Sequence, residues 1–459
     1  MASNARDNND TNGAGWLESS GLPHILRTLG LAVQPAKLGI ALAAIVLTCV
    51  WGTLLDSFWT ATSHGVELDA ITRLVEAREH GRPFAELPGE HGVFEVWGAH
   101  QRACIVGLLG SSVPAMSVAA RTTVGTFVDT HAVTSPLDNL ANMTLGVWWL
   151  VRYHPLFAVL FGAAGLLIWS LAGGALCRMA AVQFARDERP TLRQATAFAR
   201  DRLLGGFFLA PCFPLGVVAV TGVVMFLGGM VLSIPFLGDL IGGVAFSLAI
   251  LGGFVVSVLL VGFAVGGSLL WPAIAVEGSD AFDAFSRSLA YTLTKPWKTL
   301  LYAVISIVFA AICWVVVNLF TFFAMTFTRI VVGFGTAPFG WWGRGEEGDM
   351  PNKLERIWPM GGPDALYIAP NWGELPWYEY ISAGLIAIHV LLVIGLLWSF
   401  LASFYFCGST VVYCLLRRDV DVVSLEEVYL EEDKPTAVEK PSGDASLSVT
   451  GGSAPDGGK

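Results

Sequence analysis

Long apolar runs without charged side chains follow one another along most of the chain. Six runs contain no Asp, Glu, Lys or Arg. They lie between residues 37 and 56, 152 and 178, 202 and 239, 239 and 277, 298 and 329, and 379 and 417. A helix of about 20 apolar residues crosses the hydrocarbon core of a bilayer and satisfies its own backbone hydrogen bonds. The pattern therefore predicts an all-α, polytopic transmembrane helix bundle of about six spans, with cytoplasmic amphipathic surface helices.

The polar segments between these runs predict the organisation of the chain. We expect a polar cytoplasmic leader at 1–37, a first span at 38–60, an external loop region with interfacial helices at 61–150, and a four-span core with cytoplasmic amphipathic helices at 151–330. An external aromatic-rich loop at 331–378, a last span at 379–418 and an acidic, partly disordered cytoplasmic tail at 419–459 follow. Residues 103–120 are also free of charge, which leaves a seven-span alternative open. Their serines and Pro114 favour an interfacial or re-entrant helix.

Composition and charge place the chain in a membrane and orient it. With 54% hydrophobic and 14% charged residues and a mean hydropathy of +0.61, the chain has too much apolar surface for a water-soluble core. Placing both termini in the cytoplasm puts 17 of the 27 Lys and Arg residues inside. A seven-span chain would put 18 inside, so this count does not decide the number of spans. We expect a multi-pass protein of the cell (inner) membrane, without a cleaved signal peptide, that contacts membrane lipids and no nucleic acid.

A charged, amphipathic stretch at 275–300 interrupts the apolar runs. Ser279 is the expected N-cap, and Pro296 ends the predicted helix near Lys295. The helix has two faces: Phe282, Phe285 and Leu289 recur on one side, and Asp283 and Arg287, four residues apart, pair on the other. We predict a surface helix on the cytoplasmic face, with Phe282, Phe285 and Arg287 as its principal residues.

The same order of features occurs elsewhere in the chain. Residues 173–204 and 266–301 each run from a Gly-Gly pair through a small-residue tail and a charged turn to an amphipathic helix and a new span, at an offset of roughly 90 residues. A weaker third copy starts at Gly408. The order predicts parallel repeats of span, surface helix and span. The alternative is that glycines near helix ends and charged loops occur in any polytopic protein.

The stretch 275–301 resembles the membrane domain that accompanies some glycerophosphodiester phosphodiesterases and related bacterial membrane proteins. The resemblance rests on a V-E-G, an A-x-x-R-S segment and a Trp before a new span: Val276, Glu277, Gly278, Ala284, Arg287, Ser288 and Trp297. It covers roughly residues 170–330 and implies a multi-span scaffold. The phosphodiesterase activity of that family belongs to a soluble barrel, which we expect to be absent here, so the resemblance argues against inheriting the enzyme.

Histidines are the first candidates for chemistry. Six of the eight lie in the first external region, near Glu86, Glu90 and Glu95: His64, His80, His91, His100, His131 and His154. No H-x-x-x-H spacing occurs, so we predict ordinary surface histidines, no metal and no cofactor. The seven cysteines form no CxxC pair, and no Walker loop, G-x-S-x-G elbow or H-E-x-x-H is present. We therefore expect no enzymatic activity.

Four polar or helix-breaking residues lie inside predicted spans. Asn318 and His389 are candidate intramembrane polar sites, which normally face the bundle interior and either join helices or line a substrate path. Pro211 and Pro214 are a candidate helix break, because each removes a backbone donor. A simple packing kink is the alternative to a transporter-like broken helix.

The second predicted external loop is rich in tryptophan. Trp341, Trp342, Trp358, Trp372 and Trp377 are candidates for docking a membrane-protein partner or for anchoring at lipid headgroups. The sequence predicts an integral membrane protein of non-enzymatic type that organises or assists a membrane assembly. The alternative is a transporter or lipid-handling permease.

Overall fold

The computed structural model describes residues 21–59, 92–112, 135–235, 237–336, 353–358 and 375–430. The N-terminal half contains α2 (Leu22–Leu26), α3 (Thr28–Ala32), α4 (Pro35–Asp56), α6 (Val93–Ser112), α8 (Pro136–Tyr153), α9 (Pro155–Arg186), α10 (Leu192–Asp201), the π-helix η4 (Leu203–Phe208) and α11 (Leu209–Leu232). The rest contains α12 (Leu237–Gly266), the 3-10 helix η5 (Gly267–Leu269), α13 (Leu270–Glu277), α14 (Ala281–Thr294), α15 (Pro296–Thr336), α16 (Lys353–Ile357) and α17 (Trp377–Asp421).

Six helical segments of the described chain are long and apolar enough to cross a membrane. They are Pro35–Asp56, Pro155–Arg186, Leu203–Leu232, Phe246–Glu277, Pro296–Thr336 and Trp377–Asp421. The predicted all-α, polytopic fold is confirmed. Helix α6 contains residues 103–112 of the ambiguous stretch and is not among the six segments, while residues 113–120 lie outside the described part of the chain.

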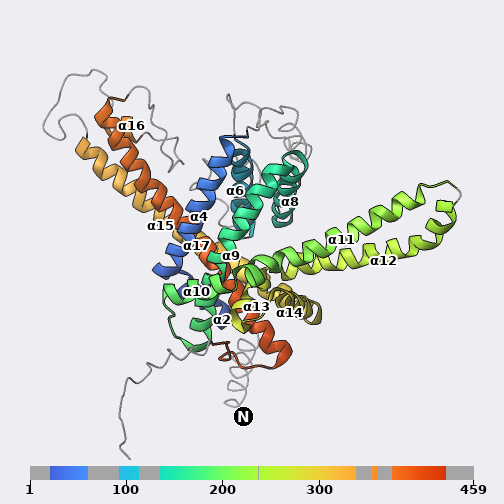
Figure 1. Cartoon of the computed structure of the whole chain (residues 1–459). Coiled ribbons are helices and arrows are strands. Elements are labelled where there is room, and N and C mark those ends of the chain that lie inside the picture. Colours follow the sequence, from blue (N-terminus) through green and yellow to red (C-terminus); the bar gives the residue numbers. More distant parts are fainter. Residues whose placement is uncertain are drawn as a thin grey trace, which may run out of the picture.

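The six segments form three antiparallel hairpins that diverge from a common base (Figure 1). The pairs are α4 with α9, α11 with α12, and α15 with α17. We call the base the hub: it comprises α2, α3, α10, η4, α13, α14, residues 172–186 of α9 and residues 400–421 of α17. Each hairpin leaves the hub and returns to it, so the first and last described residues lie at the same end of the molecule (Figure 1).

Three chain segments end side by side in the hub, each at a residue in the left-handed backbone region. The residues are Asp187 after α9, Gly278 after α13 and Val422 after α17, with φ between 57° and 68°. A left-handed residue closes a helix by donating its N–H back to a carbonyl of the last turn, and glycine adopts that backbone without strain. The three segments correspond to the three predicted repeat copies, and the ends of α9, α13 and α17 pack against one another.

Small residues let these segments approach closely. A Cβ atom placed on Gly173 would lie 2.6 Å from the Trp271 ring and 2.8 Å from the Phe406 ring. These two rings stack on each other with centroids 5.5 Å apart. Spanning helices gain no hydrophobic energy from each other in lipid, so such close van der Waals packing is a main source of their association. The hub is therefore the tightly packed part of the molecule.

Helices α6 and α8, which belong to the region predicted to be external, fold against the ends of α4 and α9 that lie far from the hub. The carboxylate of Asp56, at the end of α4, accepts hydrogen bonds from the N–H groups of Phe94 (2.7 Å) and Glu95 (3.1 Å) and so caps the first turn of α6. Helices α6 and α8 pack along each other, and Leu109 of α6 belongs to the same buried apolar cluster as the hub. Helix α6 thus extends beside the spans from the far end toward the hub.

We expect Gly173→Ala to lower the free energy of unfolding by about 1–3 kcal/mol, because its new methyl group must displace the Trp271 and Phe406 rings. The matched control is Gly165→Ala on the same helix, where no atom lies within 4 Å of the added Cβ. That variant should be neutral or slightly stabilised, since alanine favours the helix. Thermal unfolding in one detergent compares the two, and equal midpoints would contradict the close packing at the hub.

Candidate functional site

Helix α14 of the hub carries the predicted amphipathic pattern. Its N-cap is Asp280, whose carboxylate accepts the Asp283 N–H at 2.9 Å, so the prediction of Ser279 was wrong by one residue. The carboxylate takes the cap because it also complements the positive end of the helix dipole. The helix ends at Lys295, and Pro296 starts α15, as predicted.

The apolar face of α14 packs against α11, α12 and α13. Phe285 is buried, and its ring centroid lies 5.4 Å from that of Phe213 in α11. Phe282 differs from the prediction: its ring contacts Phe213 edge-on, but the side chain is 62% exposed. The buried stripe runs instead through Ala281, Ala284, Phe285, Ser288, Tyr291 and Thr292. Phe282 therefore lies at the edge of the buried face of α14 and not at its centre.

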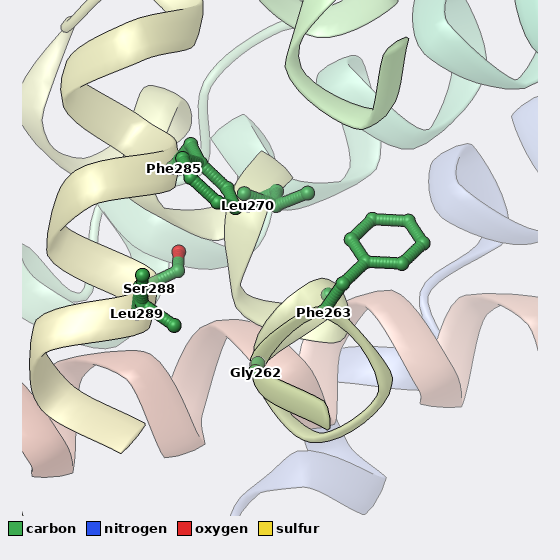
Figure 2. Close-up of a pocket in the computed structure, with 8 residues that line it drawn as sticks. Gly262, Phe263, Leu270, Phe285, Ser288 and Leu289 are labelled. Carbon is green, nitrogen blue, oxygen red and sulfur yellow. The ribbon is translucent and has the colours of Figure 1, made fainter. Parts of the chain in front are cut away.

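A shallow apolar groove lies between α14 and the end of α12 (Figure 2). It is lined by Gly262, Phe263, Gly266, Gly267, Leu270, Phe285, Ser288 and Leu289 and contains about 160 Å³ of empty space that opens to the outside. The groove has no room for the centre of a water molecule. It is therefore a helix-packing seam and not a ligand cavity.

Glu277 is the centre of the polar part of the hub. It ends α13, and its side chain is only 8% exposed. The carboxylate lies 2.6 Å from Arg287 of α14 and 3.4 Å from Arg417 of α17, and it accepts a hydrogen bond from the Tyr413 hydroxyl. Arg287 also pairs with Asp283, which confirms the pair predicted at four-residue spacing. One carboxylate therefore joins three helices.

A second series of polar contacts extends from this carboxylate to the end of α17. The rings of Tyr413 and Tyr291 have centroids 5.6 Å apart, and the Tyr291 hydroxyl donates to the Asp421 carboxylate. Burial raises the pKa of the Tyr291 hydroxyl well above its usual range, and the hydrogen bond to Asp421 raises the pKa further. Tyr291 is thus held neutral, as a hydrogen-bond donor.

Asp419 makes the corresponding contacts between α15 and α17. Its carboxylate lies 2.7 Å from the Lys298 ammonium and 3.1 Å from the Arg418 guanidinium, and it accepts a hydrogen bond of 2.9 Å from the Tyr302 hydroxyl. Lys298 and Tyr302 belong to the first turns of α15, so this cluster attaches the start of the fifth span to the end of the sixth.

These clusters join the helices of the hub through ion pairs and hydrogen bonds. The Glu277 and Asp419 carboxylates each have cationic and hydroxyl partners, which compensate the cost of removing them from water. Within the described part of the chain, no three His, Cys, Asp or Glu side chains are close enough to hold a metal ion. The arrangement thus fixes the relative positions of α13, α14, α15 and α17.

The predicted intramembrane polar residues lie in different environments. Asn318 of α15 is 1% exposed and faces the interior, as expected. His389 of α17 is exposed, and its Nδ1 atom lies 2.7 Å from the Leu385 carbonyl oxygen one turn earlier. The prediction of an interior position was therefore wrong for His389, because its Nδ1 atom finds a partner on α17 itself and needs no neighbouring helix. The two residues therefore do not line a common path.

Pro211 and Pro214 do not break α11, which continues as an α-helix through both. The irregular turn is η4, which precedes them and in which the Phe207 N–H bonds to the Arg202 carbonyl five residues earlier. Because Pro211 has no N–H, the Phe207 carbonyl lacks its usual partner four residues later. The Trp271 indole N–H donates to this carbonyl at 2.8 Å. Pro211 thus leaves the Phe207 carbonyl free to accept the hydrogen bond that attaches α13 to the third span.

The tryptophans predicted to dock a partner differ in their exposure. Trp358 is buried at the end of α16, and its carbonyl accepts a hydrogen bond of 2.9 Å from Arg329. It packs in an apolar cluster with residues of α15 and α17, so it is not available as a docking residue. Trp377, at the start of α17, is 76% exposed. Trp341, Trp342 and Trp372 lie outside the described residues.

Two of the six histidines that were predicted to be external lie within the described residues. The Nε2 atom of His100 lies 2.9 Å from the Asn142 carbonyl oxygen and joins α6 to α8. His154 is buried against Trp149, so its predicted surface position was wrong. Its place between α8 and α9 explains this, because the two helices meet there. His64, His80, His91 and His131 lie outside the described part.

Several residues that hold the hub together were not singled out in the sequence. Lys37, at the start of α4, is fully buried and donates to the Leu31 carbonyl and to the Gln183 side chain, both at 3.0 Å. In the sequence it marks the boundary of an apolar run, where a lysine usually reaches the interface. Tyr413 and Arg417 lie in the third repeat copy, whose similarity to the second copy was the available signal.

We expect Glu277→Ala to lower the free energy of unfolding by about 2–3 kcal/mol, below the range for a fully buried pair because Arg287 is 41% exposed. The loss follows from leaving Arg287 and Arg417 without their shared carboxylate. Asp201→Ala is the control, since it removes a pair exposed on both sides and should cost less than about 1 kcal/mol. Unfolding midpoints measure both, and a smaller effect at Glu277 than at Asp201 would contradict its central role.

The neutral Tyr291 hydroxyl predicts a loss of stability in alkali. An unfolded tyrosine ionises near pH 10, whereas the raised pKa of Tyr291 keeps the folded form protonated. Its contribution is complete below about pH 10 and is lost as the pH rises toward the folded pKa. We therefore expect the difference in melting temperature between the wild type and Tyr291→Phe to shrink above pH 10. A difference that stays constant from pH 7 to 11.5 would show that the hydroxyl is not held neutral.

Comparisons with known proteins identify no relative of this chain. No family model matches the chain, and no match was found among the curated proteins or the solved structures. The membrane-domain resemblance of residues 275–301 therefore stays a prediction.

Proposed function

We propose that this integral membrane protein has a non-enzymatic role, in which it organises or assists a membrane assembly through the α11–α12 hairpin. The observation that carries the proposal is the burial of the spans. In the most apolar 18-residue stretch of each span, 22–28% of the residues are buried in four of the six spans. The corresponding values are 0% for Leu203–Leu232 and 6% for Phe246–Glu277.

The α11–α12 hairpin exposes large apolar side chains on both of its helices. Phe226 of α11 and Phe254 of α12 are 68% and 67% exposed. The hairpin packs on itself and, near its base, on α14, while the other two hairpins share contacts through α4, α9 and α17. A spanning pair that its own chain leaves uncovered is available to the spans of another membrane protein.

The hub supports this role because it holds the base of the hairpin rigidly. Trp271 attaches α13 to η4, and Glu277 attaches α13 to α14 and α17. The exposed part of the hairpin thus projects from a fixed base (Figure 1). A fixed base with an uncovered spanning pair is suited to positioning a partner within the bilayer.

The proposal places the hub on the cytoplasmic side of the cell (inner) membrane. Both described ends of the chain lie at the hub, and this arrangement agrees with the excess of Lys and Arg expected inside. It also includes the resemblance to the membrane domain of glycerophosphodiester phosphodiesterases, as a shared multi-span scaffold. Partners would be membrane lipids and other membrane proteins.

A transporter or lipid-handling permease is the second candidate, and helix irregularities favour it. The π-helix η4 begins the third span and the 3-10 helix η5 interrupts the fourth, as broken helices do at many transport sites. Both interruptions, however, lie at the hub, where Gly206, Phe207 and Leu269 are buried. The observations therefore favour the assembly role.

Photo-crosslinking distinguishes these candidates. We expect p-benzoylphenylalanine in place of Phe226 or Phe254 to form crosslinks to a second membrane protein in native membranes. The matched control is Phe320 of α15, which is 74% exposed but belongs to another hairpin. It should yield lipid adducts only. Lipid adducts alone at all three positions, identified by mass spectrometry, would overturn the assembly role of the hairpin.

A further inference from the structure

After α17 the chain continues across the surface of the hub. We call residues 422–430 the strap. Val422 adopts the left-handed conformation that ends α17, and the chain then continues without a helix through Leu430. The strap lies against the end of α13, where Glu277 and Gly278 are located.

Main-chain hydrogen bonds hold the strap. The Tyr429 N–H donates to the Val276 carbonyl oxygen at 2.8 Å. The Arg417 guanidinium donates to the Glu427 carbonyl oxygen at 2.7 Å, and it lies 3.7 Å from the Glu427 carboxylate. Contacts of this kind recognise an extended backbone in addition to particular side chains, as in other proteins that bind extended peptides.

Two side chains of the strap occupy defined places. Val428 is buried in the apolar cluster of the hub. The Tyr429 ring lies against Gly278, where a Cβ atom would come within 2.6 Å of it. The Arg202 guanidinium lies 5.2 Å from the centre of the Tyr429 ring, on the cation–π face, and 4.2 Å from that of Phe198. The surface thus offers an apolar site, a flat site for an aromatic ring, and two arginines.

We propose that this surface of the hub is a docking site for an extended protein segment with an aliphatic–aromatic pair preceded by an acidic residue, and that the strap occupies it as a displaceable internal ligand. The arginines Arg202 and Arg417 select for acidic and aromatic chemistry, and the absence of a side chain at Gly278 admits the ring. The inference is independent of the proposed role of the α11–α12 hairpin, which lies outside this surface.

Displacement of the strap is a competition with a tethered ligand. The strap continues directly from α17 through Val422, so its local concentration near the site is high, in the millimolar range for a short connection. An outside segment must compete with that concentration and binds strongly only when the strap is released. The site would then be covered in the free protein and open to a partner that outcompetes or modifies the strap.

The test uses the full chain with a specific protease site inserted between Val423 and Ser424, cut after purification in detergent. The probe is a fluorescent peptide of residues 424–433, SLEEVYLEED. We expect it to bind the cut protein at least ten-fold more tightly than the uncut protein and to displace the cleaved fragment. Fluorescence anisotropy measures binding, and an unchanged melting temperature after cutting shows that the hub stays folded.

Variant peptides test the proposed contacts. Tyr429→Ala and Val428→Asp in the peptide should each reduce binding by ten-fold or more, while a change of Ser424 to Ala should leave it unaltered. Arg417→Gln in the protein should weaken binding of the wild-type peptide. Equal binding to cut and uncut protein, or a cleaved fragment that excess peptide never displaces, would overturn the proposal. Strap-dependent co-purification of two differently tagged copies would also overturn it, because the strap would then bind a second copy of this chain.

Discussion

The burial of the Glu277 carboxylate where three helices meet is the constraint on which the hub depends. A charge at this depth is stable only with its partners in place, so Arg287, Arg417 and Tyr413 must all arrive at one point. Their arrival fixes the turn after α13, the orientation of α14 and the end of α17 together. The main effect of the charge is therefore on specificity: a hub packed in another arrangement would leave the Glu277 carboxylate buried without its partners.

The surroundings of this carboxylate explain why the molecule combines a tight base with open hairpins. In lipid, apolar side chains gain little by leaving one apolar environment for another, so spanning helices associate where small residues and polar contacts permit. Such contacts are concentrated in the hub, at Gly173, at the Trp271–Phe207 hydrogen bond and around Asp419. Helices α11 and α12 contact each other, but their contacts with the hub lie near their base, and many of their large apolar side chains face outward. The two proposed interaction surfaces follow from this division: one is apolar and within the bilayer, and the other is polar and at the hub.

Several local predictions succeeded because they depend on spacing within one helix. The Asp283–Arg287 pair and the end of α14 before Pro296 follow from helical periodicity and proline chemistry. Predictions failed where another element supplied the deciding contact. Phe282 lies at the margin of the buried stripe because the position of α11 sets which face is covered, and Trp358 is buried because α15 and α17 pack over it. Pro211 did not break its helix, since the Trp271 indole satisfies the carbonyl that the proline leaves open.

The sequence by itself determined the all-α fold, the six spans and the positions of the amphipathic helices, because length, hydropathy and the absence of charge are properties of single segments. It also contained the three similar segments whose ends build the hub. Only the tertiary structure decided that these ends meet, that Glu277 of one pairs with Arg417 of another, and that Lys37 is buried at the start of α4. The physical reason is that such contacts join residues 97 or more positions apart in the chain, and no local pattern records which partner completes a buried charge.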